Sequence, residues 1–271
     1  MILTRHQTPQ GPRWARDGCY LPAALGLSNL LALPRDAMVK VLEALPPGPP
    51  AETEALPPID PMQEVWACGV TYQRSRDARQ AESQVANVYE RVYQAERPEV
   101  FLKALGWRVV GPAGLIRVRR DSHWTVPEPE MVLVANSQGE IVGYCAGDDV
   151  SSRDIEGENP LYIPQAKIYD GACALGPGIS LADPATLGDL PVHLVIRRAS
   201  EVCFEGRTRT SQMARRLEEL VAYIFRELAC PQGVFIMTGT GIVPPDSFAL
   251  APGDRVRVEI GELVLENEVA S

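Results

Sequence analysis

Residues 128–150 read EPEMVLVANSQGEIVGYCAGDDV, and no other stretch predicts the architecture as directly. The apolar runs MVLVA (131–135) and IVGY (141–144) flank NSQGE, whose Asn, Ser and Gly are typical turn residues. Two apolar runs around such a turn predict an antiparallel hairpin. Carboxylates stand before the first run and after the second, so we expect the hairpin to bring them to one end.

A second hairpin is predicted farther along the chain. RVRVEI (255–260) and LVLE (263–266) are joined by the turn residues Gly261-Glu262. Strand patterns of this kind outnumber the helical patterns, and no strand–helix alternation recurs along the sequence. The sequence therefore predicts a β-rich α+β fold and not a doubly wound parallel sheet.

Three segments have apolar residues at helical spacing. They cover residues 35–45, 85–93 and 213–228, and Ser211 stands where its hydroxyl can cap the third helix. We expect these apolar stripes to face the core.

The sequence also predicts a division into domains. The segment PPGPPAETEALPP (46–58) cannot lie inside a helix or a central strand, because its prolines lack the backbone N–H group. We therefore expect a small N-terminal domain over 1–45, a proline-rich linker over 46–61 and the main domain over 62–271.

Composition excludes several classes of protein. The formal net charge of −9 over 271 residues argues against nucleic acid or an anionic membrane as partner. The N-terminal residues lack the apolar core of a signal peptide, so we expect a cytoplasmic protein. Six cysteines without a CxxC pair are not a zinc ribbon or a thioredoxin-like site, and we expect free thiols.

The acidic residues around the first hairpin are the first candidates for chemistry. Glu128 and Glu130 lie two residues apart and project from the same face of a strand. Asp148 and Asp149 follow the second run and can approach them. A hard divalent cation bound by oxygen ligands would justify such a cluster, and a solvated acidic strand end is the alternative.

Two further features could act beside these carboxylates. Lys167 follows Asp149 by 18 residues, and a nearby metal ion favours the neutral amine that accepts a proton. An ordinary surface lysine is the alternative. The glycine–threonine turn TGTG (238–241) offers backbone N–H groups and a hydroxyl to a carboxylate.

Taken together, the segments from about residue 67 to 267 resemble the fumarylacetoacetate hydrolase family. The matching segments are GVTY, FLKALGWRVVGP, the ExE strand, GDDVSSRDIE, AKIYD, LGPGI, TSQM and TGTGIVPP. The resemblance implies a mixed β-sheet roll with a small N-terminal domain, dependence on Mg²⁺ and a homodimer. It places the metal ligands on Glu128, Glu130 and Asp149, the active-site lysine on Lys167, and the substrate-gripping pair on Gly239 and Thr240.

Two positions depart from the family pattern. Members that hydrolyse carbon–carbon bonds carry a histidine and a glutamate where this chain has Ser75 and Ala78, so the expected base for activating water is missing. Asp148 stands where the family usually has asparagine.

The segments GVTYxxSRxAR, DIEGENPLYxPQAKIYD and TGTGIVPP resemble a dehydratase branch of the family. This branch implies Mg²⁺-dependent conversion of 2-keto-3-deoxy-pentonate to 2,5-dioxopentanoate in sugar-acid catabolism, by enolate formation and β-elimination. Lys167 is then the candidate base and Glu156 the candidate acid. Tyr72, Ser75 and Arg76 are candidate contacts of the small 2-oxo acid substrate.

Three matters stay open at this point. A carbon–carbon bond hydrolase of acylpyruvates or related diketo acids could recruit another base, such as Glu82 or His123. A binding protein that keeps the fold without activity is a third class. The ligand set does not separate Mg²⁺ from Mn²⁺, because both accept the same oxygen ligands.

Overall fold

The first predicted hairpin is confirmed and forms the centre of the larger sheet. The computed structural model describes residues 1–82 and 87–270. Strands β9 (Pro129–Ala135) and β10 (Ile141–Asp149) pair antiparallel, with Glu130 opposite Gly147. Both strands are buried along their whole length. The two aspartates are therefore the last residues of β10 and do not follow the strand.

The larger sheet has ten strands in the order β3-β2-β1-β12-β10-β9-β15-β5-β6, with β4 paired to β1. All neighbours are antiparallel except β15 and β5, which are parallel. The other strands are β1 (Ile2–Thr8), β2 (Gly11–Arg16), β3 (Cys19–Tyr20), β4 (Ala55–Leu56), β5 (Glu64–Gly69), β6 (Glu99–Leu105), β12 (Cys173–Leu181) and β15 (Val234–Met237).

A second sheet of five strands packs against this centre, in the order β14-β13-β16-β17-β7. The second predicted hairpin, β16 (Arg255–Ile260) and β17 (Leu263–Val269), is confirmed. Every other residue of these two strands is buried, because one face packs on the core. The remaining strands are β7 (Leu115–Ile116), β13 (Pro191–Arg198), β14 (Glu201–Arg209) and the separate pair β8 (Thr125–Val126) and β11 (Ser151–Ser152).

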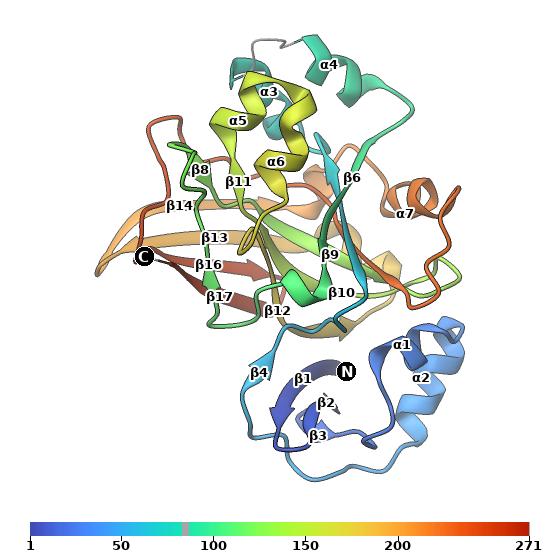
Figure 1. The fold of residues 1–271 in the computed structure, drawn as a ribbon. Coiled ribbons are helices and arrows are strands. Elements are labelled where there is room, and N and C mark those ends of the chain that lie inside the picture. Colours follow the sequence, from blue (N-terminus) through green and yellow to red (C-terminus); the bar gives the residue numbers. More distant parts are fainter. Residues whose placement is uncertain (83–86, 271) are drawn as a thin grey trace.

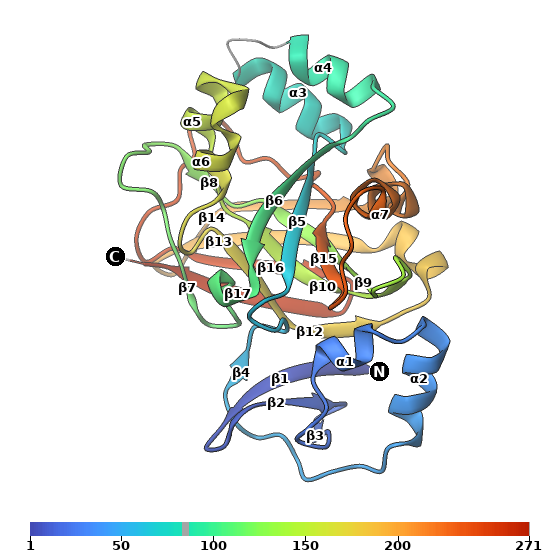
Figure 2. The ribbon, with the colours of Figure 1, turned by 45° about the vertical axis from the view of Figure 1, so that its right-hand side comes forward.

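The helices gather mainly at the two ends of the molecule. Figures 1 and 2 show α3 to α6 together above one end of the larger sheet and α1 and α2 at the opposite end. The α-helices are α1 (Leu27–Leu31), α2 (Arg35–Ala44), α3 (Gln73–Glu82), α4 (Asn87–Gln94), α5 (Arg153–Glu158), α6 (Ile163–Lys167) and α7 (Leu217–Phe225). Short 3₁₀ turns cover η1 (Gly106–Arg108), η2 (Pro160–Tyr162), η3 (Pro184–Asp189) and η4 (Thr210–Gln212).

The helix predictions have three outcomes. The helix over 35–45 is confirmed as α2. The helix over 213–228 is shorter than predicted, because Met213 forms a β-bridge with Tyr72 and the Ser211 hydroxyl donates to Asp189 instead of capping the helix. For the helix over 85–93, α4 covers the described part, and residues 85 and 86 lie outside the described residues.

The N-terminal segment is joined to the larger sheet. Strand β1 pairs with β12, Leu3 lying opposite Ile179, and β4 inside the predicted linker pairs with β1. The division at 1–45, 46–61 and 62–271 stays a prediction. All six cysteines are unpaired, as predicted. None of the helices in the described part of the chain has the length and apolar character needed to cross a lipid bilayer.

Candidate active site

Three carboxylates meet at one end of the central hairpin, as the sequence predicts. Glu128 precedes β9, Glu130 belongs to it, and Asp149 ends β10. One oxygen from each lies within 4.8 Å of the others, and all three side chains are buried. The Asp149 N–H donates to the Glu128 carbonyl over 2.9 Å, so the backbone itself holds the ligands together.

This cluster fits a hard divalent cation. The pKa of the Glu130 carboxyl is raised well above its usual range, first by burial and then by the charges of Asp149 and Glu128. Like charges in a buried site are unfavourable unless a cation compensates them. An all-oxygen donor set is the kind that Mg²⁺ and Mn²⁺ prefer. The residues present therefore match the expected metal.

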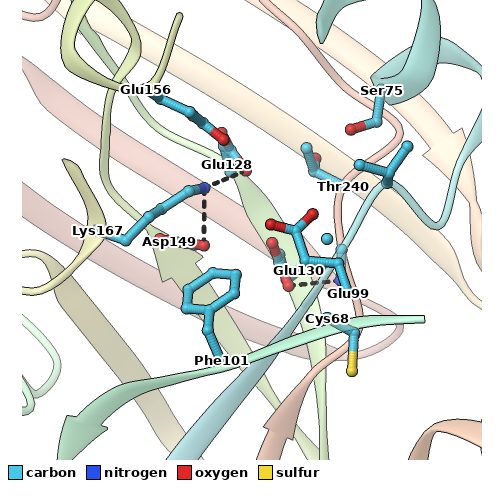
Figure 3. A pocket seen from close by; sticks show the side chains of 13 residues that line it. Cys68, Ser75, Glu99, Phe101, Glu128, Glu130, Asp149, Glu156, Lys167 and Thr240 are labelled. Carbon is cyan, nitrogen blue, oxygen red and sulfur yellow. Dashed lines mark hydrogen bonds and ion pairs between the residues drawn. The ribbon is translucent and has the colours of Figure 1, made fainter. Parts of the chain in front are cut away.

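Lys167 lies beside the three carboxylates and not on the surface. It is the last residue of α6 and is buried. Its Nζ atom donates to Glu128 Oε2 and Asp149 Oδ2, both over 3.0 Å, and to Ser151 Oγ over 2.6 Å. Figure 3 shows the amine between the two carboxylates at the edge of the pocket.

Asp149, and not Asp148, belongs to the cluster. The Asp148 carboxylate accepts the Glu128 N–H over 2.9 Å and so supports the backbone of the site. Burial is the main cause that raises the pKa of Asp148 to about 7.

The glycine–threonine turn follows β15 and reaches the metal site. Gly239 has a φ of +88°, and its N–H donates to Glu130 Oε2 over 2.6 Å. Gly239 also lines the pocket, and its contact with substrate stays a prediction. Thr240 lines the pocket, and its hydroxyl oxygen accepts the Ile242 N–H over 3.2 Å.

Two of the other predicted residues line the same pocket, and two do not. Ser75 and Glu156 border it, from α3 and α5. Tyr72 is buried with its ring against Gly241. Arg76 pairs with Asp77 and lies over the ring of Tyr93. Tyr72 and Arg76 are absent from the described lining, and their contact with substrate stays a prediction.

Five lining residues were not singled out from the sequence. They come from β5, β6 and the residue after β5, and are Cys68, Gly69, Val70, Glu99 and Phe101. In Figure 3, Glu156 and Lys167 border the pocket on one side, and Glu99 and Cys68 on the other. The parallel pairing of β5 with β15 brings these residues to the site, and such long-range pairing leaves no local signal in the sequence.

Two buried cationic side chains outside the described pocket lining form ion pairs with carboxylates of the cluster. Arg153 pairs with Glu128 Oε1 over 3.0 Å, and Lys103 forms an ion pair with Asp149 Oδ1. A lysine inside the apolar run of β6 is the one signal that could have drawn attention to Lys103.

His123, one of the two bases named for the hydrolase alternative, is not among the described residues that line the pocket. His123 is 89% exposed and pairs with Asp154 over 2.8 Å. The side chain of Glu82 lies outside the described part of the chain.

Comparisons with known proteins agree with this geometry. The family model described as Fumarylacetoacetate (FAA) hydrolase C-terminal matches residues 64–270. A probable 2-keto-3-deoxyxylonate dehydratase of Haloferax volcanii is 47% identical over 225 residues, which is 81% of this chain and 76% of that protein. A 2-dehydro-3-deoxy-D-arabinonate dehydratase of Saccharolobus solfataricus is 45% identical over 212 residues, which is 76% of this chain and 70% of that protein.

Solved structures give the same result. The apo form of a 2-keto-3-deoxy-D-arabinonate dehydratase superposes with a TM-score of 0.84 at 35% identity, covering 100% of this chain and 99% of that chain. A structure of a 2-keto-3-deoxy-D-arabinonate dehydratase with magnesium and 2,5-dioxopentanoate gives a TM-score of 0.81 at 32% identity, with coverage of 100% and 99%. The fold, the buried acidic cluster and these matches together establish that the chain belongs to the fumarylacetoacetate hydrolase family.

Proposed function

We propose that this protein is a Mg²⁺-dependent hydro-lyase that converts a 2-keto-3-deoxy-pentonate to 2,5-dioxopentanoate in sugar-acid catabolism. One observation carries the proposal: Lys167 and an oxygen-only triad share a pocket in which Ser75 replaces the water-activating histidine. Elimination of water needs no activated water, so this pocket suits it better than hydrolysis. The dehydratases similar to this chain are named for such substrates.

Glu128, Glu130 and Asp149 are the residues that would hold the metal. When bound, Mg²⁺ supplies positive charge to the carboxylate and 2-keto oxygens of the substrate. The three carboxylates are buried, so water is excluded from the site and the attraction between the metal charge and the substrate oxygens is stronger. The remaining steps belong to the protein side chains that border the pocket.

Lys167 is the base for the first proton. Its Nζ atom takes the proton from C3, and the electron pair of the broken C–H bond enters the 2-keto group as an enolate. When that group re-forms, the electron pair makes the C3–C4 double bond and expels the C4 hydroxyl. The contact with Ser151 Oγ holds the nitrogen in place during this transfer.

The departing hydroxyl needs a proton, and two carboxyl groups outside the triad border the pocket. Glu156 is the candidate named from the sequence, and Glu99 on β6 is the second. After donating its proton, the same carboxylate can take one from C5, while Lys167 returns its proton to C3. These transfers place the double bond between C4 and C5 and give the C5 enol, while both enzyme groups return to their starting states. The enol then loses its hydroxyl proton and gains a proton at C4, which gives the aldehyde. The net change is the loss of one water molecule.

The experiment that tests this function combines the purified protein, Mg²⁺ and 2-keto-3-deoxy-pentonate of both configurations at C4. We expect 2,5-dioxopentanoate, detected by mass spectrometry, and no product after addition of a chelator. Two smaller fragments would instead indicate carbon–carbon hydrolysis. No product from a folded, metal-loaded protein with either configuration would reject the proposal.

The identity of the acid is decided by two variants and a control. Glu156→Gln and Glu99→Gln each remove one candidate, and Glu43→Gln on the exposed side of α2 is the matched control. Loss of a general acid lowers turnover by about 10²–10⁴-fold. We expect this loss in Glu156→Gln. Full turnover in Glu156→Gln with loss in Glu99→Gln would move the role to Glu99.

We also propose that the protein acts as a homodimer in the cytoplasm. Unpaired thiols at all six cysteines are typical of a reducing compartment, and the family resemblance implies the dimer. Light scattering should give a mass near twice the 29.6 kDa of one chain, and a monomer mass would reject the dimer. Cell fractionation tests the location.

A further inference from the structure

Lys103 is a fully buried lysine that borders no part of the pocket. Its side chain has 0% exposure, and its Nζ atom meets three oxygens. These are Asp149 Oδ1 in an ion pair, the Val150 carbonyl at 3.2 Å and the Lys167 carbonyl at 2.5 Å. An ammonium group has three N–H donors, so each has a partner. A charge taken out of water needs such compensation, and here it contacts the segments that carry both a metal ligand and the candidate base.

The backbone places Lys103 there by an irregularity of the sheet. Val65 of β5 pairs with Ala104 of β6, whereas the next residue, Trp66, pairs with Leu102. Strand β6 therefore has one extra residue at this point, and that residue is Lys103. Such a bulge changes the direction of a side chain and is frequent beside active sites.

The choice of lysine is unusual for this chain. Of its 26 basic residues only Lys40, Lys103 and Lys167 are lysines, and two of these three converge on Asp149. A guanidinium group is planar and spreads its donors over a fork, whereas an ammonium group directs three donors from one atom. Three oxygens around one nitrogen suit lysine and do not suit arginine.

We propose that Lys103 is a positioning residue that gives the two carboxylate oxygens of Asp149 different roles. It binds Oδ1 from outside the pocket, so that Oδ2 alone faces the pocket, where Lys167 now contacts it. Through the Lys167 carbonyl it also fixes the backbone from which the base projects. The inference deepens the proposed function and rests on it for the catalytic part alone, because metal binding can be measured without substrate.

The test compares Lys103→Met, Lys103→Arg and the control Lys40→Met, whose side chain is exposed. Mg²⁺ affinity is measured by calorimetry and folding by circular dichroism. Loss of a group that orients a metal ligand weakens binding by about 10–100-fold. We expect this loss in both Lys103 variants and none in Lys40→Met. At saturating Mg²⁺ we expect kcat to fall at least about tenfold, with a smaller change in KM, because Lys103 does not border the pocket.

Two results would decide against the proposal. Mg²⁺ affinity of Lys103→Met within twofold of wild type, or tighter, would mean that Lys103 only contributes stability or repels the cation. Wild-type affinity in Lys103→Arg would mean that charge alone matters. If Lys103→Met does not fold, Lys103→Gln, which keeps a neutral donor, replaces it under the same criteria. A wild type without dehydratase activity would reject the proposed function and leave the binding result intact.

Discussion

Replacing Gly239 by alanine should damage both the stability and the metal site. Gly239 has a φ of +88°, in the left-handed region that favours glycine. A side chain there costs about 1–2 kcal/mol in backbone strain. An added Cβ would also lie less than 3.0 Å from the Thr71 hydroxyl oxygen and 3.1 Å from the Cys68 carbonyl. Overpacking of this kind costs about 1–3 kcal/mol more.

The sum predicts that Gly239→Ala lowers the free energy of unfolding by about 2–5 kcal/mol. For a chain of this size each kcal/mol lowers Tm by about 2–4 °C, so calorimetry should show a fall on the order of 10 °C. Gly253→Ala is the matched control, because φ at Gly253 is +82° and nothing lies within 4 Å of an added Cβ. It should lose only the strain contribution, about 1–2 kcal/mol.

The second readout is the metal. The Gly239 N–H holds Glu130 Oε2, so a displaced turn should weaken Mg²⁺ binding by about 10–100-fold in Gly239→Ala. Gly253→Ala should bind Mg²⁺ as wild type does. The double variant Thr71→Ala/Gly239→Ala should recover the clash with the Thr71 hydroxyl and keep the strain. It also loses the buried hydrogen bond from that hydroxyl to the Thr238 carbonyl, so Thr71→Ala alone is its reference. Equal losses of stability in the two glycine variants, or unchanged Mg²⁺ affinity in Gly239→Ala, would refute this explanation of the turn.

Three further predictions concern the same site. Lys167→Met should lower turnover by about 10²–10⁴-fold in a product assay while calorimetry still detects Mg²⁺ binding; near-normal turnover would exclude Lys167 as the base. Mg²⁺ at about 100 times its Kd should stabilise the protein by about 2.7 kcal/mol in thermal denaturation, and Glu130→Gln should lose most of this gain; a gain that survives this variant would place the metal elsewhere. The raised pKa of Asp148, about 7 against an ordinary 3.8, means that the folded state binds the extra proton and that stability falls as pH rises from about 4 to about 7. In metal-free protein Asp148→Asn should therefore be more stable than wild type at pH 8, by up to about 4 kcal/mol, and nearly equal at pH 4; the same difference at both pH values would contradict the titration.

The sequence alone was enough for the hairpins and for the triad. Apolar runs around a turn are local signals. The hairpin that they predict brings the residues at the ends of its two strands together. Glu128, Glu130 and Asp149 therefore meet because they flank one hairpin. The family resemblance depended on short segments in a fixed order, which is also a property of the chain and not of its packing.

The helix over 213–228 shows where local pattern is insufficient. Its apolar spacing continues through Met213, yet the backbone there pairs with Tyr72 across the fold. Tertiary pairing of the backbone outweighed helix propensity, which is a weak preference when another element supplies hydrogen bonds.

Only the tertiary structure determined which groups surround the triad. Glu99 and Phe101 reach the pocket through the pairing of β6 with β5 and of β5 with β15, and Lys103 reaches Asp149 through a bulge in β6. The Gly239 N–H reaches the cluster from the turn after β15 and donates to Glu130. The contacts of Lys103 with Asp149 and of Gly239 with Glu130 join residues 46 and 109 positions apart, so no periodicity or spacing records them. The sequence specifies short-range geometry through turn and strand preferences, whereas the register between distant strands is fixed only when the whole core packs.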